Sequence, residues 1–167
     1  SSLHVAPRSE GSAGCIVRDG SMTSAAMLEL GHEQLVKDFV NWIAPYQFPS
    51  GKVPCVVDRR GPDPVPEHDS HGQLIWLIAN TYRYTHDEAI VRNHFPRVRK
   101  AVEYIESLRA ERMTEEFGLS GPPRQEPGKP AVPAAAFRGL VPESISHEGY
   151  SAKPMHSFWD TFFILRG

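Results

Sequence analysis

The feature that most constrains this sequence is a pair of helical segments that occurs twice in the same order. In each pair a mostly apolar segment comes first, at 21–30 and 69–85, and a segment with one apolar stripe follows, at 32–47 and 86–112. A third apolar segment begins at Ser157. The sequence therefore predicts a helical-hairpin repeat with a period of roughly fifty residues, which is typical of repeat architectures.

Short polar residues mark the expected starts of these helices. Ser21, Asp69 or Ser70, and Asp87 stand where N-caps would lie, and their side chains can accept hydrogen bonds from the first backbone amides. Pro96 falls inside the fourth predicted helix and should kink it.

Proline and glycine are concentrated between the helices. At 48–67 and 117–154 they are dense enough to predict long loops without regular elements. Residues 1–14 are rich in serine and glycine and show no periodicity, which indicates a flexible N-terminal arm. We expect one domain at 15–167, since 167 residues suffice for a sizeable core.

Charge and composition limit the classes of partner. Lysine and arginine number 18 against 20 aspartates and glutamates, and no basic run argues for nucleic acid. No stretch approaches the roughly 20 apolar residues of a membrane span, and the opening residues lack the apolar core of a signal peptide. We expect a soluble protein with no membrane partner. Cys15 and Cys55 predict neither a disulfide framework nor a metal site, so the compartment stays open.

The order of the helices predicts how they pack. The mostly apolar helices must lie inside and the striped ones outside, because only this layout buries the first set and wets one face of the second. The sequence thus predicts an all-α fold, an α/α toroid with two full hairpins and the start of a third. The N-termini of the inner helices would meet at one end of the ring, together with the loops before them.

Unusual polar and aromatic residues stand at these helix starts. They are Arg18 and Asp19 at the first inner helix, Glu67, His68 and Asp69 at the second, and His156, Trp159 and Asp160 at the third. Asp69 or Asp160 alone could serve a cap or a helix dipole. Taken together, the residues suit a carbohydrate site, because glycosidic cleavage needs one carboxylic acid to protonate the leaving oxygen and one carboxylate to activate water.

At these residues the sequence resembles the six-hairpin glycosidases, the (α/α)6-toroid enzymes that include glucoamylases, trehalases, processing α-glucosidases and the glucosidase half of glycogen debranching enzymes. The stretch IVRDGSM is similar to the family's Arg-Asp segment that binds sugar hydroxyls in the −1 subsite, which implies that role for Arg18 and Asp19. The stretch HSFWD is similar to the segment with the general acid directly after a tryptophan. This implies that Asp160 is the acid and that Trp159 lines the same subsite.

The stretch PVPEHDSHGQ is similar to the loop before the second inner helix in uncharacterised bacterial members, which implies that Glu67, His68 and Asp69 face the pocket. The resemblance covers 15–167 and is weakest at 117–139. It implies the N-terminal part of the catalytic toroid of an inverting glycoside hydrolase, acting without a cofactor on α-glucosides or related sugars. The family's general base, a carboxylate near the end of the toroid, has no counterpart here.

Other readings stay open. Glu143 and Glu148 lie in the loop before Asp160 and are weaker candidates for substrate binding. Without a recognisable base, the chain could be a non-catalytic carbohydrate-binding or scaffold module. The apolar inner segments at 74–79 and 162–166 would be exposed at the open edge of an incomplete ring, so we expect self-association or contact with the remaining part of the toroid.

Three histidines support a minor alternative. His68, His71 and His156 could serve a toroid sugar epimerase or lyase, in which His or Tyr is the usual base. A metal site at His68, Asp69 and His71 is not expected, because ligands crowded over four residues cannot all point at one ion. A serine hydrolase is not expected either, since neither G-x-S-x-G nor a convincing strand is found.

Overall fold

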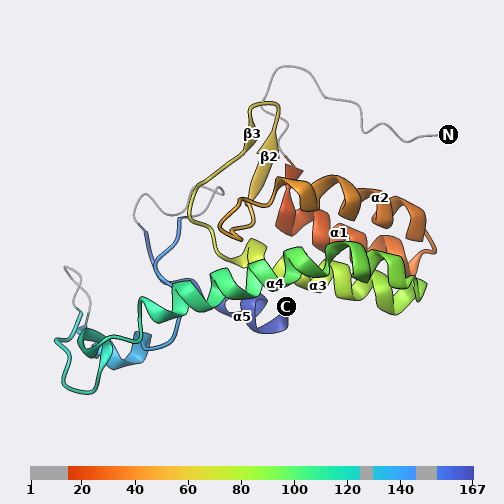
Figure 1. Cartoon of the computed structure of the whole chain (residues 1–167). Coiled ribbons are helices and arrows are strands. Elements are labelled where there is room, and N and C mark those ends of the chain that lie inside the picture. The colour runs from red at the N-terminus through yellow and green to blue at the C-terminus, as the bar shows by residue number, and fades with distance from the viewer. Residues whose placement is uncertain (1–14, 125–129, 146–153) are drawn as a thin grey trace.

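The computed structural model describes residues 15–124, 130–145 and 154–167, which are mostly helical (Figure 1). The predicted arm at 1–14 and the candidate Glu148 lie outside these residues. The all-α class is confirmed at this level, with a small sheet added. The α-helices are α1 (Val17–Glu29), α2 (Glu33–Ile43), α3 (Asp69–Thr85), α4 (Glu88–Ala110) and α5 (Phe158–Arg166).

Helix α3 lies at the centre of the helical core. It packs against α1, α2, α4 and α5, and every side chain from Leu74 to Ile78 is buried. The prediction of a buried apolar centre in this helix is therefore confirmed. The two predicted hairpins, α1–α2 and α3–α4, are both present. Each outer helix buries one stripe, which includes Val36, Val40 and Ile43 in α2 and Ile90, Ala101 and Ile105 in α4.

Helix α5 approaches α3 closely at Gly72. A Cβ atom at this position would lie 2.0 Å from the backbone oxygen of Phe163, so a side chain here would force the two helices apart. This close packing brings the first turn of α5 against the first turn of α3, where the candidate site lies.

A small antiparallel sheet, absent from the prediction, forms beside the start of α1 (Figure 1). Its strands are β1 (Cys15–Ile16), β2 (Val56–Asp58) and β3 (Gly61–Pro62), in the order β1-β2-β3. The expectation of no regular element at 48–67 was therefore wrong. The amide of Val17 donates to the carbonyl of Cys55 at 2.8 Å. This bond fixes the start of α1 against the loop that leads into α3.

Two of the predicted N-caps are wrong. Helix α1 begins at Val17, directly after the β1 pairing, so Ser21 lies inside the helix and is buried. Helix α3 begins with Asp69 itself after His68, and neither Asp69 nor Ser70 caps it. The physical reason is tertiary contact: strand pairing sets the start of α1, and the carboxylate of Asp69 is engaged by α5.

The other two helix starts agree with the sequence. Asp87 caps α4 by accepting a hydrogen bond from the amide of Ala89 at 3.0 Å. Ser157 precedes α5 and its hydroxyl accepts from the amide of Asp160 at 3.3 Å. Helix α4 continues through Pro96.

The expected open edge is only partly present. The prediction for 74–79 was wrong, because the neighbouring helices cover α3 and leave Leu74 to Ile78 buried. In α5, by contrast, Phe162 is 65% exposed and Leu165 is 77% exposed. Within the described ranges, no helix is both long and apolar enough to cross a membrane.

Candidate functional site

Residues expected at the helix starts come together in the structure. They come from the first turns of α1, α3 and α5 and from the segment before α3, and they are Arg18, Glu67, Asp69, Trp159 and Asp160, with the backbone amide of His68. We call Arg18, Glu67, Asp69 and Asp160 the carboxylate cluster. All four of its residues are buried. The starts of α1, α3 and α5 thus bring together residues that are far apart in the sequence.

Arg18 is the positive centre of the carboxylate cluster. Its Nη1 lies 3.5 Å from Oε1 of Glu67 and 3.7 Å from Oδ2 of Asp69. Its Nε lies 3.6 Å from Oδ1 of Asp19, whose side chain is 64% exposed. The guanidinium also lies over the ring of Trp159, with Cζ 5.7 Å from the ring centroid. Arg18 therefore joins the buried carboxylates to the exposed Asp19.

A hydrogen bond across two helices fixes Trp159. Its indole Nε1 donates to Oδ2 of Asp69 at 2.8 Å, which docks the first turn of α5 on the first turn of α3. Trp159 remains 42% exposed. Part of its ring therefore faces solvent, while its indole N–H is hydrogen-bonded inside the protein. Such an arrangement presents an aromatic surface in a fixed orientation.

The carboxyl group of Asp160 is buried beside a backbone donor. The residue is 3% exposed. Its Oδ2 lies 3.4 Å from the donating amide of His68, and the nearby Ser144 favours the ionised form of the carboxyl group. The carboxyl group is therefore held against the segment that leads into α3.

The charges of the carboxylate cluster are unbalanced, because three buried carboxyl groups share Arg18. Burial raises the pKa of Asp69 to about 6, aided by the charges of Asp160 and Glu67, although Trp159 and Arg18 oppose the shift. Burial also raises the pKa of Asp160, against the opposing effects of Ser144 and the amide of His68. A low-dielectric environment disfavours the anion, so this site holds a proton more strongly than carboxylates in water do.

The two histidines beside the cluster have the opposite shift. Burial, with the charge of Lys52, lowers the pKa of His68 to about 4, and burial lowers that of His71 well below its ordinary value. Nδ1 of His71 accepts a hydrogen bond from the amide of Val53 at 3.2 Å. The backbone of Glu143 lies near the His68 ring and favours its charged form, without the geometry of a hydrogen bond. Both rings are therefore neutral at pH 7.

No metal centre is evident in the ranges that the structure describes. Among these residues, no three or more His, Cys, Asp or Glu side chains are arranged to hold a metal ion. A groove of about 800 Å³ lies between α3 and α4 and is lined largely by apolar residues such as Ile78, Val91 and Phe95. None of its lining residues belongs to the carboxylate cluster.

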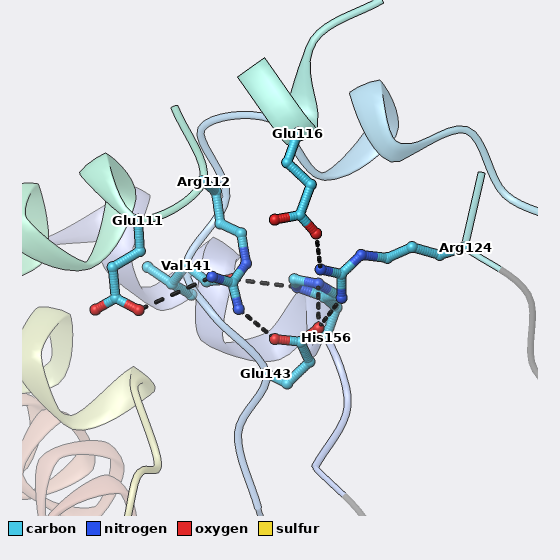
Figure 2. A network of polar contacts seen from close by, with 7 residues as sticks. All are labelled: Glu111, Arg112, Glu116, Arg124, Val141, Glu143 and His156. Carbon is cyan, nitrogen blue, oxygen red and sulfur yellow. Dashed lines mark hydrogen bonds and ion pairs between the residues drawn. The ribbon is translucent and has the colours of Figure 1, made fainter. Parts of the chain in front are cut away.

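Glu143 and His156, both expected at the same mouth, belong to a different network near the C-terminal end of α4 (Figure 2). Arg112 forms an ion pair with Oε2 of Glu143. On the other carboxylate oxygen, Arg124 Nη1 lies at 2.6 Å and His156 Nε2 at 3.2 Å. We call Arg112, Arg124, Glu143 and His156 the Glu143 clamp.

Positive charge dominates the Glu143 clamp. Burial acts to raise the pKa of Glu143, but backbone hydrogen bonding, the hydrogen bond from Arg112 and the nearby positive charges together hold it below the ordinary value. Burial lowers the pKa of His156, although the Glu143 carboxylate opposes this shift. The guanidinium groups of Arg112 and Arg124 also lie over the ring of Phe117, at 5.0 and 4.8 Å from its centroid. Glu143 is thus held as an anion between two arginines.

Ser144 is a neighbour of Asp160 that the sequence did not single out. It lies in an irregular segment, and its one-residue step from Glu143 carries no helix or strand pattern that would place it near Asp160. Its backbone pairs with Met155 in an isolated antiparallel bridge. A sequence signal for this contact would require knowing that the segments around 144 and 155 pair.

Comparison of the chain with protein-family models, with curated proteins and with solved structures gives no match. The chemistry of the site therefore has to be argued from its own groups. A carboxyl group with a raised pKa, next to an aromatic ring and a guanidinium, is suited to giving a proton to a bound oxygen.

Proposed function

We propose that this chain is the N-terminal part of an (α/α)6 toroid, and that the complete toroid is an inverting glycoside hydrolase for α-glucosides or related sugars. One observation carries the proposal: the starts of α1, α3 and α5 bring Asp160 and Trp159 together with Arg18 and Asp69. Three successive inner helices that present such groups at one end are what a toroid active site requires.

Asp160 acts as the general acid. A general acid must hold its proton near the working pH, and burial raises the pKa of Asp160 in that direction. The hydrogen bond from the amide of His68 helps to hold the carboxyl group in one orientation, as proton transfer to a fixed oxygen demands. Asp69, with a pKa of about 6, adds a nearby negative charge above that pH and so helps Asp160 to retain its proton.

Trp159 and Arg18 bind the sugar beside the acid. The half-exposed indole of Trp159 offers an apolar face to a sugar ring, and its bond to Asp69 holds that face in place. Arg18 and the exposed Asp19 offer donors and acceptors for hydroxyl groups. Glu67 contacts the same guanidinium, with its Oε1 3.5 Å from Nη1 of Arg18, and helps to keep it in position.

The general base comes from a part of the toroid beyond these hairpins. Glu143 does not fill that role, because Arg112 and Arg124 pair with its two carboxylate oxygens and its pKa is held below the ordinary value. An inverting mechanism needs a second carboxylate that activates water on the opposite face of the sugar.

A second candidate function is a carbohydrate-binding module without turnover. The observation that favours it is the enclosure of Asp160, which is 3% exposed while Trp159 is 42% exposed. A sugar could then stack on Trp159 without reaching the carboxyl group. The epimerase or lyase reading has less support, because His68 and His71 are both buried and Nδ1 of His71 is already used by Val53.

The test is to incubate the protein, as its source makes it, with a panel of α-glucosides and to follow the products by proton NMR. Release of the β-anomer of the sugar supports the inverting hydrolase. Sugar binding by calorimetry without any release favours the binding module, and an epimerised or unsaturated product favours the minor alternative. Absence of both binding and release contradicts the carbohydrate proposal as a whole.

A further inference from the structure

Residues 141–145, which we call the bridging segment, are hydrogen-bonded to the stretches of chain that lead into α3 and α5. The amide of Ser144 donates to the carbonyl of Met155 at 2.9 Å, and the amide of Met155 donates to the carbonyl of Ser144 at 3.0 Å. The amide of Ile145 donates to the carbonyl of Pro66 at 3.0 Å. Met155 comes just before α5 and Pro66 just before α3. The bridging segment therefore links the approaches to the two helices whose first turns meet at the candidate site.

The bridging segment is held in turn by the Glu143 clamp (Figure 2). Arg112 and Arg124, which follow α4 in the sequence, pair with the two carboxylate oxygens of Glu143. His156 contacts the segment twice, since its Nε2 lies 3.2 Å from Oε1 of Glu143 and its Nδ1 lies 3.2 Å from the carbonyl oxygen of Val141. The clamp thus ties the bridging segment to the residues that follow α4 and to the approach to α5.

The backbone of the bridging segment has few contacts of its own. Its pairing with Met155 is an isolated bridge and not a strand ladder, and Pro142 has no amide to donate. Fixing the backbone of irregular residues costs conformational entropy, which a few backbone hydrogen bonds offset only in part. Glu143 is the one charged residue of the segment, and its charge-assisted contacts supply the remaining hold.

We propose that Glu143 is a positioning residue: through the bridging segment, the clamp sets how the approaches to α3 and α5 are spaced, and thereby orients Trp159 against Asp69. For its catalytic meaning the inference rests on the proposed function. The structural link from Glu143 to Trp159 does not depend on that function.

The start and the end of α5 are held by different contacts, which makes the proposal specific. At the start, Nε1 of Trp159 donates to Oδ2 of Asp69 at 2.8 Å. Farther along, α5 packs closely on Gly72, and Cζ of Arg166 lies 4.5 Å from the ring centroid of Trp76 in α3. Loss of the clamp should therefore loosen the first turn of α5 and leave its last turn in place.

The three tryptophans of the chain report on these places separately. Trp159 reports on the first turn of α5, Trp76 on its last turn, and Trp42 on α2. The experiment is proton–nitrogen NMR of the labelled full chain, which measures how fast each indole N–H exchanges with solvent. Trp42→Phe and Trp159→Phe assign two of the resonances and leave the third to Trp76.

Glu143→Gln is the main variant. It keeps the size of the side chain but removes its charge, so the side chain can no longer pair with both arginines. The exchange of the Trp159 indole N–H should become about tenfold faster, the effect of one weakened hydrogen bond to a charged group. The exchange rates of Trp76 and Trp42 should stay as they are in the wild type.

A second variant and a control accompany it. Arg124→Met leaves Arg112 on Glu143 and should give the same pattern with a smaller change. Should Glu143→Gln fail to fold, the rates of Trp159 and Trp76 in Arg124→Met decide the question by the same criteria. Glu88→Gln is the matched control, because it breaks an exposed pair with Arg92 at the other end of α4 and should change none of the exchange rates.

Two results would overturn the inference. Equal acceleration at Trp159 and Trp76 would show that Glu143 stabilises the whole fold and not the first turn of α5, and an unchanged Trp159 rate would show that the two are not linked. The exchange experiment uses no sugar, so its result is independent of the proposed function. If Trp159 responds as expected and no sugar is bound or cleaved, the positioning role of Glu143 stands and the glycosidase proposal fails.

The catalytic meaning has its own readout. In an active enzyme, Glu143→Gln should lower kcat/KM about tenfold, because the ring that stacks on the sugar is no longer held in place, whereas Glu88→Gln should not. An unchanged kcat/KM together with faster exchange at Trp159 would overturn the catalytic part of the inference.

Discussion

Two clusters of carboxylates and arginines in this molecule differ in their balance of charge and in their burial. The carboxylate cluster sets one guanidinium against three buried carboxyl groups around the starts of α1, α3 and α5. The Glu143 clamp sets two guanidinium groups and a histidine against one partly exposed carboxylate near the end of α4 (Figure 2). The same side-chain types therefore meet in opposite proportions.

The consequence is that the two clusters hold protons differently. The pKa of Asp69 is raised to about 6 by burial first and then by neighbouring anions, and that of Asp160 is raised as well. The pKa of Glu143 is lowered, because hydrogen bonds and positive charges outweigh its burial. In the carboxylate cluster, the raised pKa values mean that Asp69 and Asp160 hold a proton more strongly than carboxyl groups in water do. In the Glu143 clamp, the two arginines hold the Glu143 carboxylate in place.

Removing Arg18, the cation of the carboxylate cluster, should have the largest effect on stability. Arg18→Met leaves three buried carboxyl groups without their shared partner, so we expect a loss of about 3 to 5 kcal/mol in the free energy of unfolding at pH 7. Arg124→Met in the clamp should cost about 1 kcal/mol or less, because Arg124 is partly exposed and Arg112 still holds Glu143. Urea unfolding of both variants measures the difference.

The pH dependence of Arg18→Met adds a control. Its loss should shrink at pH 5, where the carboxyl groups can take up protons instead of remaining as unpaired anions. Equal losses for Arg18→Met and Arg124→Met would contradict the assignment of the excess buried charge to the carboxylate cluster.

Asp69→Asn tests, through its effect on stability, whether Asp69 binds a proton more tightly in the folded protein than in the unfolded chain. With a pKa of about 6 in the folded protein against 3.8 in the unfolded chain, Asp69 binds a proton more tightly when folded. Its contribution to stability is therefore present below pH 4 and is lost as the pH rises to 6, by on the order of 3 kcal/mol. Asparagine cannot ionise, so the variant lacks this loss.

The quantity to measure is the difference in unfolding free energy between Asp69→Asn and the wild type, from pH 4 to pH 7. It should grow in favour of the variant as the pH rises. The low pKa of His68, about 4, destabilises both proteins on acidification and so largely cancels in the difference. A difference that stays constant with pH would show that Asp69 is ionised normally.

A smaller effect is expected from the hydrogen bond that docks α5 on α3. Trp159→Phe keeps an aromatic ring but removes the donor to Asp69, which should cost about 1.5 kcal/mol. Trp42→Phe is the matched control, because Trp42 is 44% exposed in α2 and such a change at the surface should stay within about 0.5 kcal/mol. Indistinguishable denaturation midpoints for the two variants would count against a fixed Trp159.

The sequence predicted the elements whose signals are local. The apolar run from Leu74 to Ile78 predicted a buried helix, and Asp87 marked the start of α4, because periodicity and capping depend on neighbouring residues. The gathering of Arg18, Asp69 and Asp160 was expected from the order of the helices, and in the structure the starts of α1, α3 and α5 do lie together.

Contacts between distant segments could not be predicted in this way. Strand β1 contains only two residues, and its partner β2 lies about forty residues along the chain, so neither has a strand pattern of its own. This pairing moved the start of α1 to Val17 and took Ser21 from its predicted cap into the helix. The separation of Glu143 from the carboxylate cluster depends in the same way on Arg112 and Arg124, which no local pattern links to it.

The most direct measurement of the central claim is the rate of sugar release by Asp160→Asn in the protein as its source makes it. We expect a fall in kcat of about 10²- to 10⁴-fold, the usual contribution of a general acid, with sugar affinity retained. Asp38→Asn, the same change in α2 where Asp38 accepts a hydrogen bond from Gln34, should leave the rate unchanged. Hydrolysis by Asp160→Asn at the wild-type rate would contradict the assignment of Asp160 as the acid.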